Sequence, residues 1–542
     1  MTTPQNPPNP GWQPGPQGPG QPFNPSPQPP QGPPTGYQQN FGQQAPQGYG
    51  QQPPQGYGQQ PPQGYGQQPP QAAPKAKSKT KAIVAGGVGV AVVAAAVGLG
   101  LFFFRGSSPV AAEGLPADVT FAFEANLAPS NADKLALKGI ADKFPSLSSG
   151  NLETDYKAAV YAMITQESTD APDYAASIEP WLGDSIAIGF TGDPSDERNL
   201  IMAVETTDKG KAEAFARDEG DGARVQFIDD LMVITDENST LSVDDIKQNA
   251  LADSEQYKAD IGRLGEGNLA TLWFGPELLT TALEQVEQES GLDATSIDAD
   301  ALRDAHGAAG LKVSDNKLTA KLVMQAPNAP EASGPDVVDL ARSLPGDALA
   351  VIAAGTTDEA IGELWSTLET AAGGTDALAS FGITGVDDFR ALIGSRVGLS
   401  IGMDGGMPQV GAKLETDEPE KQKEIFDGID ELLQAGGIPG IAFAQDGNTG
   451  IVAYGQSADN LLNPASKVGD LDTFKQVVDG KAQAVVFLNV DALKALPDYE
   501  TMLNSMPDGQ LEEFLAPVSS VGIVGNAAGD HYSESFLHVT FD

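Results

Sequence analysis

The pattern of hydrophobic and polar positions divides the chain into two parts. Aliphatic residues are scarce up to residue 81, whereas from residue 115 onward short apolar runs alternate with charged amphipathic stretches. Apolar runs joined by a short turn-rich segment predict antiparallel hairpins; DSIAIGFTG and NLIMAVETT, joined by DPSDER, are one example. The stretches KGKAEAFARDE and EPEKQKEIFDGIDELL predict helices that Asp208 (or Thr207) and Asp417 can cap. We therefore predict an α+β fold in which helices pack on one face of antiparallel sheet.

The order of these elements occurs twice along the chain. LPAD at residue 115 and LPGD at residue 344 each precede an apolar strand, and WLGD and LIGS open the next strand of each series. Further on, LATLWFGPELL resembles QAVVFLNVDAL, and each series closes on two apolar strands. Because the correspondences keep their order, we predict a duplication. The predicted parts are an α+β unit over 115–326, a Pro- and Gly-rich linker over 327–343 and a second α+β unit over 344–542.

Residues 82–104 form an uninterrupted apolar segment of the length that crosses a membrane. The 23 residues AIVAGGVGVAVVAAAVGLGLFFF carry no charge, and as a helix they would extend roughly 35 Å. Four lysines lie between residues 75 and 81, whereas Arg105 stands alone after the segment. This asymmetry predicts a cytoplasmic N-terminus and an extracytoplasmic C-terminal region, joined to the span by a tether over 105–114. A cleaved signal peptide is the alternative, but the long N-terminal extension favours an uncleaved anchor.

Residues 1–81 have the composition of a disordered segment. Pro, Gln and Gly predominate, and the octapeptide QGYGQQPP occurs three times in tandem from residue 47. Such a sequence cannot bury enough apolar surface to offset the entropy lost on ordering. Two interpretations remain for this cytoplasmic tail: a multivalent segment that binds a protein partner, or an inert spacer.

Charge and the absence of cysteine exclude several classes of function. The chain has 74 acidic and 31 basic residues, for a formal net charge of −43, and no acidic residue precedes residue 82. The acidic field after the span repels phosphate backbones, so nucleic acid is excluded as a partner of this region. With no cysteine, disulfides, thiol nucleophiles and Cys-bound metals are excluded as well.

Candidate catalytic and metal-binding residues are few. GLSIG around Ser400 matches the nucleophile-elbow pattern, but its flanks continue a strand and lack the strand-to-helix turn that the motif requires. His531 and His538 are seven residues apart on the predicted final strand and would face opposite sides, and His306 stands alone. Trp181 and Trp273 are expected in the core, with a sugar-binding platform as the alternative. We therefore predict no catalytic, cofactor-binding or metal-binding residue.

The start of the second part resembles a known family. Together with the Pro/Gln/Gly/Tyr-rich tail and the Ala/Gly/Val-rich segment, LPAD at 115–118, Lys134, Leu137 and the KFP sequence at 143–145 resemble the actinobacterial domain-of-unknown-function 3352 family. Its members tend to begin the exported region with LPA-D, a strand and a helix that ends in a KFP-like sequence. The resemblance implies an actinobacterial membrane protein and brings no site residues with it.

These observations together predict a single-pass cell-envelope protein that is not an enzyme. We expect a binding or scaffold module displayed outside the cell. The alternative is a carrier of an apolar envelope ligand, which would require an apolar cavity between helices and sheet. A hydrolase that uses Ser400 or a pair of carboxylates is the third candidate.

Overall fold

The structure is a computed structural model. It describes residues 109–144, 152, 155–165, 171–192, 196–219, 223–279, 299–331, 333–372, 374–437, 439–497, 499–504 and 514–542. The predicted tail and the predicted span over 82–104 lie outside these residues. Within the described ranges, no helix combines the length and the apolar character needed to cross a bilayer.

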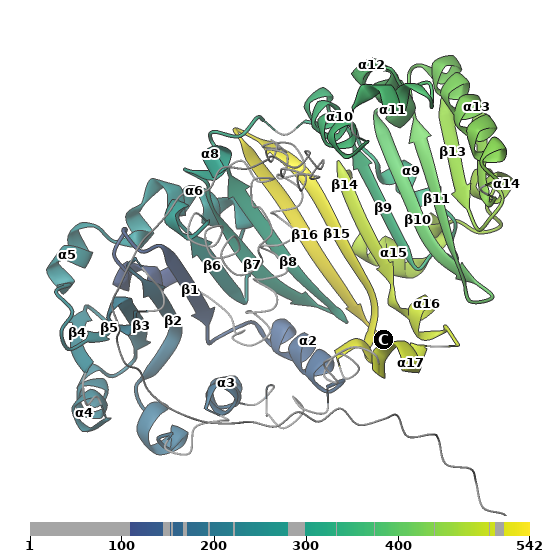
Figure 1. Ribbon diagram of the computed structural model, residues 1–542. Coiled ribbons are helices and arrows are strands. Elements are labelled where there is room, and N and C mark those ends of the chain that lie inside the picture. The colour runs from purple at the N-terminus through teal and green to yellow at the C-terminus, as the bar shows by residue number, and fades with distance from the viewer. Residues whose placement is uncertain are drawn as a thin grey trace, which may run out of the picture. The chain divides into compact units, whose positions relative to one another are not determined.

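One antiparallel sheet of sixteen strands organises the described residues (Figure 1), which confirms the predicted α+β class. The strand order is β12-β13-β11-β10-β9-β14-β15-β16-β8-β7-β6-β1-β2-β3-β5-β4. The strands of the first half are β1 Phe121–Asn126, β2 Leu182–Phe190, β3 Leu200–Thr206, β4 Ala223–Ile228, β5 Leu231–Asp236, β6 Ala270–Phe274, β7 His306–Ser314 and β8 Lys317–Gln325. Those of the second half are β9 Ala350–Gly355, β10 Arg396–Asp404, β11 Met407–Glu415, β12 Ile441–Asp446, β13 Thr449–Tyr454, β14 Ala484–Asn489, β15 Val518–Gly529 and β16 Tyr532–Phe541.

Helices connect these strands in both halves. In the first half they are η1 Pro109–Gly114, α2 Asn131–Ala141, α3 Tyr156–Ile164, η2 Tyr174–Ile178, η3 Glu197–Asn199, α4 Lys209–Glu219, α5 Val243–Gln248, η4 Leu251–Asp253, α6 Glu255–Leu264 and α8 Ala299–Leu302. In the second half they are α9 Val338–Arg342, α10 Asp358–Ala372, α11 Thr375–Ala379, α12 Val386–Ile393, α13 Pro419–Ala435, α14 Ala458–Leu462, η6 Val468–Asp470, α15 Asp472–Val477, α16 Val490–Lys494 and α17 Tyr499–Asn504.

The two halves of the sheet have the same topology and the same register. Counted outward from the junction, the first half reads β8-β7-β6-β1-β2-β3-β5-β4 and the second reads β16-β15-β14-β9-β10-β11-β13-β12. Phe123 lies opposite Ile188 and Leu272, and Ile352 takes the same place opposite Leu399 and Val486. Apart from register shifts in the β2–β3 and β15–β16 pairs, the paired strand positions of one half therefore have equivalents in the other.

The LPAD and LPGD sequences occupy equivalent and buried places. Leu115 and Leu344 are both fully buried, and their backbone oxygens accept hydrogen bonds from Leu251 of η4 and Val468 of η6, respectively. Pro116 and Pro345 form isolated β-bridges with Ala250 and Lys467. The motif thus fixes the start of each half against a later segment of the same half.

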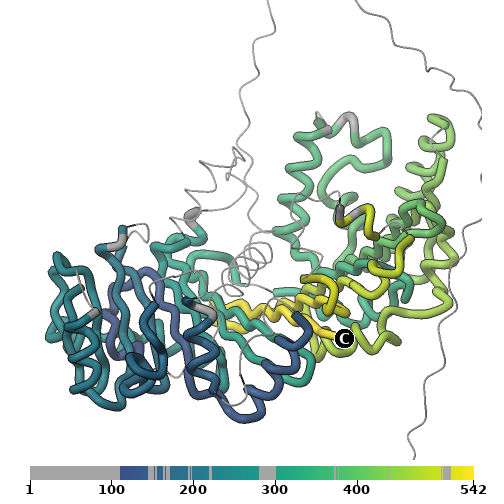
Figure 2. The backbone as a smooth tube through the Cα atoms, turned by 90° about the horizontal axis from the view of Figure 1, so that it is seen from below, coloured from purple at the N-terminus to yellow at the C-terminus, as the bar shows by residue number. Residues whose placement is uncertain are grey.

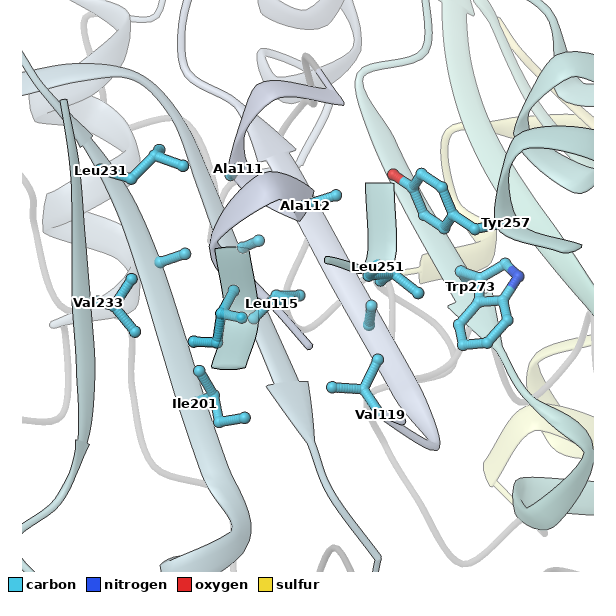
Figure 3. Packing of buried hydrophobic residues seen from close by; sticks show 14 of the residues in the cluster. Ala111, Ala112, Leu115, Val119, Ile201, Leu231, Val233, Leu251, Tyr257 and Trp273 are labelled. Carbon is cyan, nitrogen blue, oxygen red and sulfur yellow. The ribbon is translucent and has the colours of Figure 1, made fainter. Parts of the chain in front are cut away.

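The sheet has two faces, which we call face A and face B. Face A carries Phe123 in the first half and Ile352 in the second, and face B carries their neighbours Ala122 and Val351. In the first half η1, α5, η4 and α6 cover face B, and Figure 3 shows part of this core around η1. In the second half α9, α14, η6 and α15 take the same place.

Helices also pack on face A, so the prediction that they lie on one face only is wrong. In the first half, α4 places Phe215 beside the face A residues Met202 and Ile234. In the second half, Phe426 of α13 packs against Phe443 of β12, with ring centroids 5.2 Å apart. The physical reason is that many strands are apolar at successive positions, as in VTFAFEA, so both faces gain from being covered.

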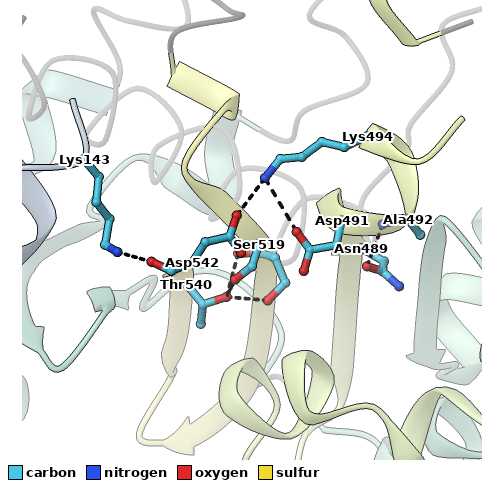
Figure 4. A network of polar contacts seen from close by, with 9 residues as sticks. Lys143, Asn489, Asp491, Ala492, Lys494, Ser519, Thr540 and Asp542 are labelled. Atoms are coloured by element: carbon cyan, nitrogen blue, oxygen red, sulfur yellow. Dashed lines mark hydrogen bonds and ion pairs between the residues drawn. The ribbon is translucent and has the colours of Figure 1, made fainter. Parts of the chain in front are cut away.

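A seam joins the halves, formed by antiparallel pairing of β8 with β16. Figure 2 shows the yellow β15 and β16 between the teal first half and the green second half. Helix α2 reinforces the seam because Ile140 packs in one cluster with Val490 and Phe541 of the second half. At the same end, Lys143 donates to the backbone oxygen of Asp542, and Lys494 pairs with the Asp542 carboxylate at 3.1 Å (Figure 4).

Segments that we assigned to a tether and a linker contribute to the core. Residues 109–114 form η1, in which Ala111 and Ala112 are fully buried. Residues 338–342 form α9, with Val338 2% exposed and Ala341 fully buried. The connection between the predicted span and the folded region is therefore only residues 105–108.

Candidate functional site

The most distinctive surface feature is a row of exposed apolar side chains on face A of the second half. Register places Ala350, Ile401, Val410, Tyr454 and Ile441 side by side across β9, β10, β11, β13 and β12. We call these five residues the open row. Ile401 is 43% exposed, Val410 40% and Tyr454 49%. Two other exposed apolar residues, Ile352 and Met403, share this face.

The open row lies on a face without charge. At the paired positions of β9, β10, β11, β12 and β13, face A carries only uncharged residues, whereas Arg396, Lys413 and Glu415 belong to face B. This segregation is notable in a chain with 74 acidic residues. Contiguous exposed apolar surface that is rimmed by polar residues is typical of interaction sites.

The equivalent row of the first half is more closed. Phe121, Phe190 and Leu200 replace Ala350, Ile401 and Val410, and all three are only partly exposed. The Phe121 and Phe190 rings pack with centroids 6.2 Å apart. An acidic residue, Asp236, stands at the position of Tyr454. The second half is therefore the one that offers an open neutral surface.

The helices of the second half leave this surface open because they pack mainly on one another. Helices α10, α11, α12 and α13 share a core that includes Ile361, Phe389 and Ile425. The bundle reaches the sheet at the outer strands through α13, and at β11 through α12. Two of its apolar residues, Phe381 and Leu432, are exposed by 37% and 39%.

A hollow of about 310 Å³ lies between α4 and β4 in the first half. Glu213 and Arg217 line it together with Val225 and Phe227. Because charged side chains contribute to its wall, this hollow differs from the enclosed apolar cavity that a buried carrier site would require. The open row, in contrast, is part of a sheet face and is not an enclosed cavity.

A buried polar cluster at the seam is the second candidate. Asp260 of α6 is fully buried and accepts hydrogen bonds from Trp273 Nε1 at 2.9 Å and Tyr532 OH at 2.9 Å. His306 Nδ1 lies 2.8 Å from Asp260 Oδ2, the oxygen that accepts from Trp273, whereas Tyr532 donates to Oδ1. The Arg263 guanidinium lies over the Tyr532 ring, 3.9 Å from its centroid. We call these five residues the seam cluster.

The seam cluster connects the halves and has a structural role. Tyr532 belongs to β16, whereas Asp260 and Arg263 belong to α6 of the first half. Arg263 also donates to the backbone oxygen of Ala528 at 3.3 Å, in the second half. Both carboxylate oxygens of Asp260 are engaged and His306 is 3% exposed, so no substrate reaches this acid–histidine pair.

The second half has apolar residues at the equivalent core positions. Phe474 and Phe487 correspond to Tyr257 and Trp273, and both pairs of rings meet edge-on. Asp260 lies three residues after Tyr257 in α6, and its equivalent in α15 is Val477, three residues after Phe474 and fully buried. A core of this shape is therefore stable without the polar groups, and those of the first half serve its junction with the second.

Glu124 is a further buried acid, on face B of β1. It is 2% exposed and accepts a hydrogen bond from Thr271 Oγ1 at 3.3 Å. Burial raises its pKa to about 7, and the neighbouring Tyr257 and Thr271 side chains and the Ala112 backbone oppose the shift. Burial followed by the charge of Glu124 raises the pKa of Tyr257 in turn. In the second half Ala353 takes this position.

Ser400 lies within β10, as the sequence predicts. It is 3% exposed, and its Oγ donates to the backbone oxygen of Gly411 at 3.5 Å. A nucleophilic serine must present its Oγ to a substrate carbonyl. The burial of Ser400 therefore removes the serine version of the hydrolase hypothesis.

The three histidines make separate contacts and do not form a common site. His306 belongs to the seam cluster, and His538 Nδ1 lies 3.0 Å from Thr319 Oγ1. Burial, followed by the charge of Lys317, lowers the pKa of His538 to about 4. His531 lies in the turn before β16 with a φ of 60°, so placing it on the final strand was wrong. Within the described ranges, no three His, Asp or Glu residues gather in a way that could hold a metal ion.

A serine–lysine contact in the second half was missed by the sequence analysis. Lys413 is 6% exposed, and its Nζ donates to Ser343 O at 2.9 Å and contacts Ser343 Oγ at 3.1 Å. Burial, followed by the charge of Lys467, lowers the pKa of Lys413. Ser343 Oγ, however, donates to Leu340 O at 2.8 Å. Lys413 thus satisfies a carbonyl at the C-terminus of α9, which is a capping role.

Trp181 and Trp273 are core residues, 4% and 3% exposed. Trp181 Nε1 donates to Ser177 O at 2.6 Å, and its ring packs on Phe215. Burial of both indoles contradicts the alternative of a sugar-binding platform.

The sequence did contain signals for Asp260 and Glu124. Asp260 lies on the apolar stripe of its helix, three residues after Tyr257 and four before Leu264. Glu124 interrupts an otherwise apolar strand. The open row had no such signal, because only the register and the placement of the helices decide which apolar side chains remain exposed.

Comparison with known proteins adds no identification. No protein-family model matches the chain, and no curated protein matches it. The solved structure titled "Structure of crystal form I of TP0453" is 10% identical, with a TM-score of 0.20, and the match covers 41% of this chain and 80% of that one. A TM-score at this level carries no argument about fold or function.

Proposed function

We propose that this protein is a membrane-anchored binding module of the cell envelope, without enzymatic activity, and that it binds through the open row. The observation that carries the proposal is the exposure of Ile401, Val410 and Tyr454 on a face without charge. Exposed apolar surface costs free energy in water, and a bound partner that covers it removes that cost.

The anchor and its orientation are part of the same proposal. The uncharged segment over 82–104 spans the membrane, residues 1–81 lie in the cytoplasm and the folded region lies outside. The lysines before the segment support this direction. In this arrangement the tail offers a site for a protein partner inside the cell, and the resemblance to the actinobacterial domain-of-unknown-function 3352 family is part of the proposal.

Site-specific photocrosslinking in cells tests the proposal. The photoreactive residue p-benzoylphenylalanine replaces Ile401 in the full-length chain, and the matched control carries it at Met407. Met407 is 65% exposed in the neighbouring strand β11, but register places it on face B. We expect an adduct at 401 that is absent at 407. Equal adducts at both positions, or none at 401, would contradict binding through the open row.

A further inference from the structure

We infer that the occupant of the open row is the acyl chain of a membrane lipid. This inference rests on the function proposed above and specifies its ligand class. It is carried by three observations: the neutrality of the face, the length of the row and the short connection to the predicted anchor.

The first observation is chemical. Ile401, Val410 and the paired positions around them offer only apolar or uncharged side chains. A protein partner of so acidic a region would be expected to use the abundant carboxylates, since charged rims steer specific protein association. A hydrocarbon chain has no charge or hydrogen-bonding group to satisfy, so it matches a surface that provides none.

The second observation is one of length. The open row crosses five neighbouring strands, from Ala350 to Ile441. Strands lie about 4.8 Å apart, so the row is roughly 19 Å long. One leaflet contributes about half of the roughly 30 Å hydrocarbon core of a bilayer. A single acyl chain therefore fits along the row with its whole length in contact with protein.

The third observation concerns access. Only residues 105–108 separate the predicted span from η1, whose alanines are fixed in the core. An extended chain covers at most about 3.5 Å per residue, so Pro109 lies within roughly 18 Å of the last residue of the span. The folded region is thus tethered at the membrane surface, where lipid is the apolar molecule present at the highest concentration. Because η1 lies on face B of the first half, this tether brings the whole molecule, and not the open row in particular, to the membrane. An acyl chain that moves from bilayer to protein exchanges one apolar environment for another.

The test uses the full-length chain in vesicles of phosphatidylethanolamine and phosphatidylglycerol that contain a phospholipid with a diazirine on its acyl chain. After illumination, mass spectrometry maps the cross-linked peptides. We expect cross-links in β10, β11 and β13 in addition to those in residues 82–104. The predicted span contacts lipid in every variant and serves as the internal standard.

Two variants of matched chemistry decide the location. Ile401→Asp should lower the cross-link yield in the strands roughly tenfold relative to the span, because a buried carboxylate opposes an apolar contact. Met407→Asp, on face B of β11, should leave the yield unchanged. Tyr454→Ser, at a half-exposed position of the row, provides a second lesion if Ile401→Asp lowers the thermal stability of the protein.

The outcomes separate this inference from the function on which it rests. Cross-links confined to residues 82–104, or equal losses in the Ile401→Asp and Met407→Asp variants, overturn the acyl-chain assignment. If the adduct formed at position 401 in cells is then a protein, the open row remains a binding surface and only its ligand class changes. If position 401 forms no adduct in cells, the proposed function fails as well.

Discussion

At the scale of single residues, Glu124 shows how one buried carboxyl makes stability depend on pH. Its ordinary pKa is 4.5, and burial raises the folded-state value to about 7. Below pH 4.5 the group is protonated in both the folded and the unfolded state, so it has no effect. As the pH rises toward 7, the unfolded state releases the proton while the folded state keeps it, so stability falls. Above pH 7 the loss is complete and amounts to roughly 3 kcal/mol.

Glu124→Gln should remove this dependence. We expect the variant to be more stable than the wild type at pH 8, by up to about 3 kcal/mol, and equally stable at pH 4. Thermal unfolding of both proteins across this range measures the difference. His538 has the opposite effect: its pKa is lowered from 6.5 to about 4, so stability rises as the pH rises between these values. This effect is the same in the wild type and in Glu124→Gln, so it cancels in their difference. A constant difference between them at all pH values would show that the Glu124 carboxyl has an ordinary pKa.

At the scale of elements, the seam depends on few side chains beyond its backbone pairing. The Tyr532 hydroxyl of β16 donates to Asp260 of α6, so it joins an element of the second half to a helix of the first. Since this bond is buried and its acceptor is an acid, its loss leaves a carboxylate oxygen short of one donor.

Tyr532→Phe tests this connection. We expect the free energy of unfolding to fall by roughly 2 kcal/mol, the range for a hydrogen bond to a charged group. Chemical denaturation measures the change. Tyr454→Phe is the matched control, because the Tyr454 side chain is half exposed, and its loss of a hydroxyl should leave stability unchanged. Similar losses in both variants would show that Tyr532 contributes nothing particular to the seam.

Element by element, the sequence predicted local structure better than packing. The hairpin of β2 and β3 and the helix α13 follow from alternation, turn residues and helical periodicity, all of which are local. That helices cover both faces was missed, because apolar residues at successive strand positions do not say which elements will cover them. The residues of η1 and α9 were assigned to connecting segments for a similar reason. Short segments rich in Ala, Pro and Gly have the composition of loops, and their helical structure depends on packing against the sheet, which local sequence does not reveal.

At the scale of the whole molecule, the predicted topology leads to a direct labelling experiment. Because the chain has no cysteine, single cysteines report without background. We expect Met407→Cys to react with a membrane-impermeant maleimide on intact cells, since Met407 is 65% exposed and belongs to the region that we propose to be extracytoplasmic. Tyr57→Cys, in the tail, should react only after the cells are lysed. Labelling of Tyr57→Cys on intact cells would reverse the proposed orientation.

The seam also has a consequence for the synthesis of the chain. Thr319 of β8 contacts His538 of β16, which lies 219 positions later in the sequence. Because chains are synthesised from the N-terminus, β8 is made long before its partner strand. Until synthesis is nearly complete, the first half presents a strand edge without its partner, and such edges are templates for pairing with other chains. The native seam joins two positionally equivalent strands, so β8 of a second nascent chain resembles the missing β16. Dimers paired edge to edge through β8 are therefore the misassembled product expected when many copies are made at once.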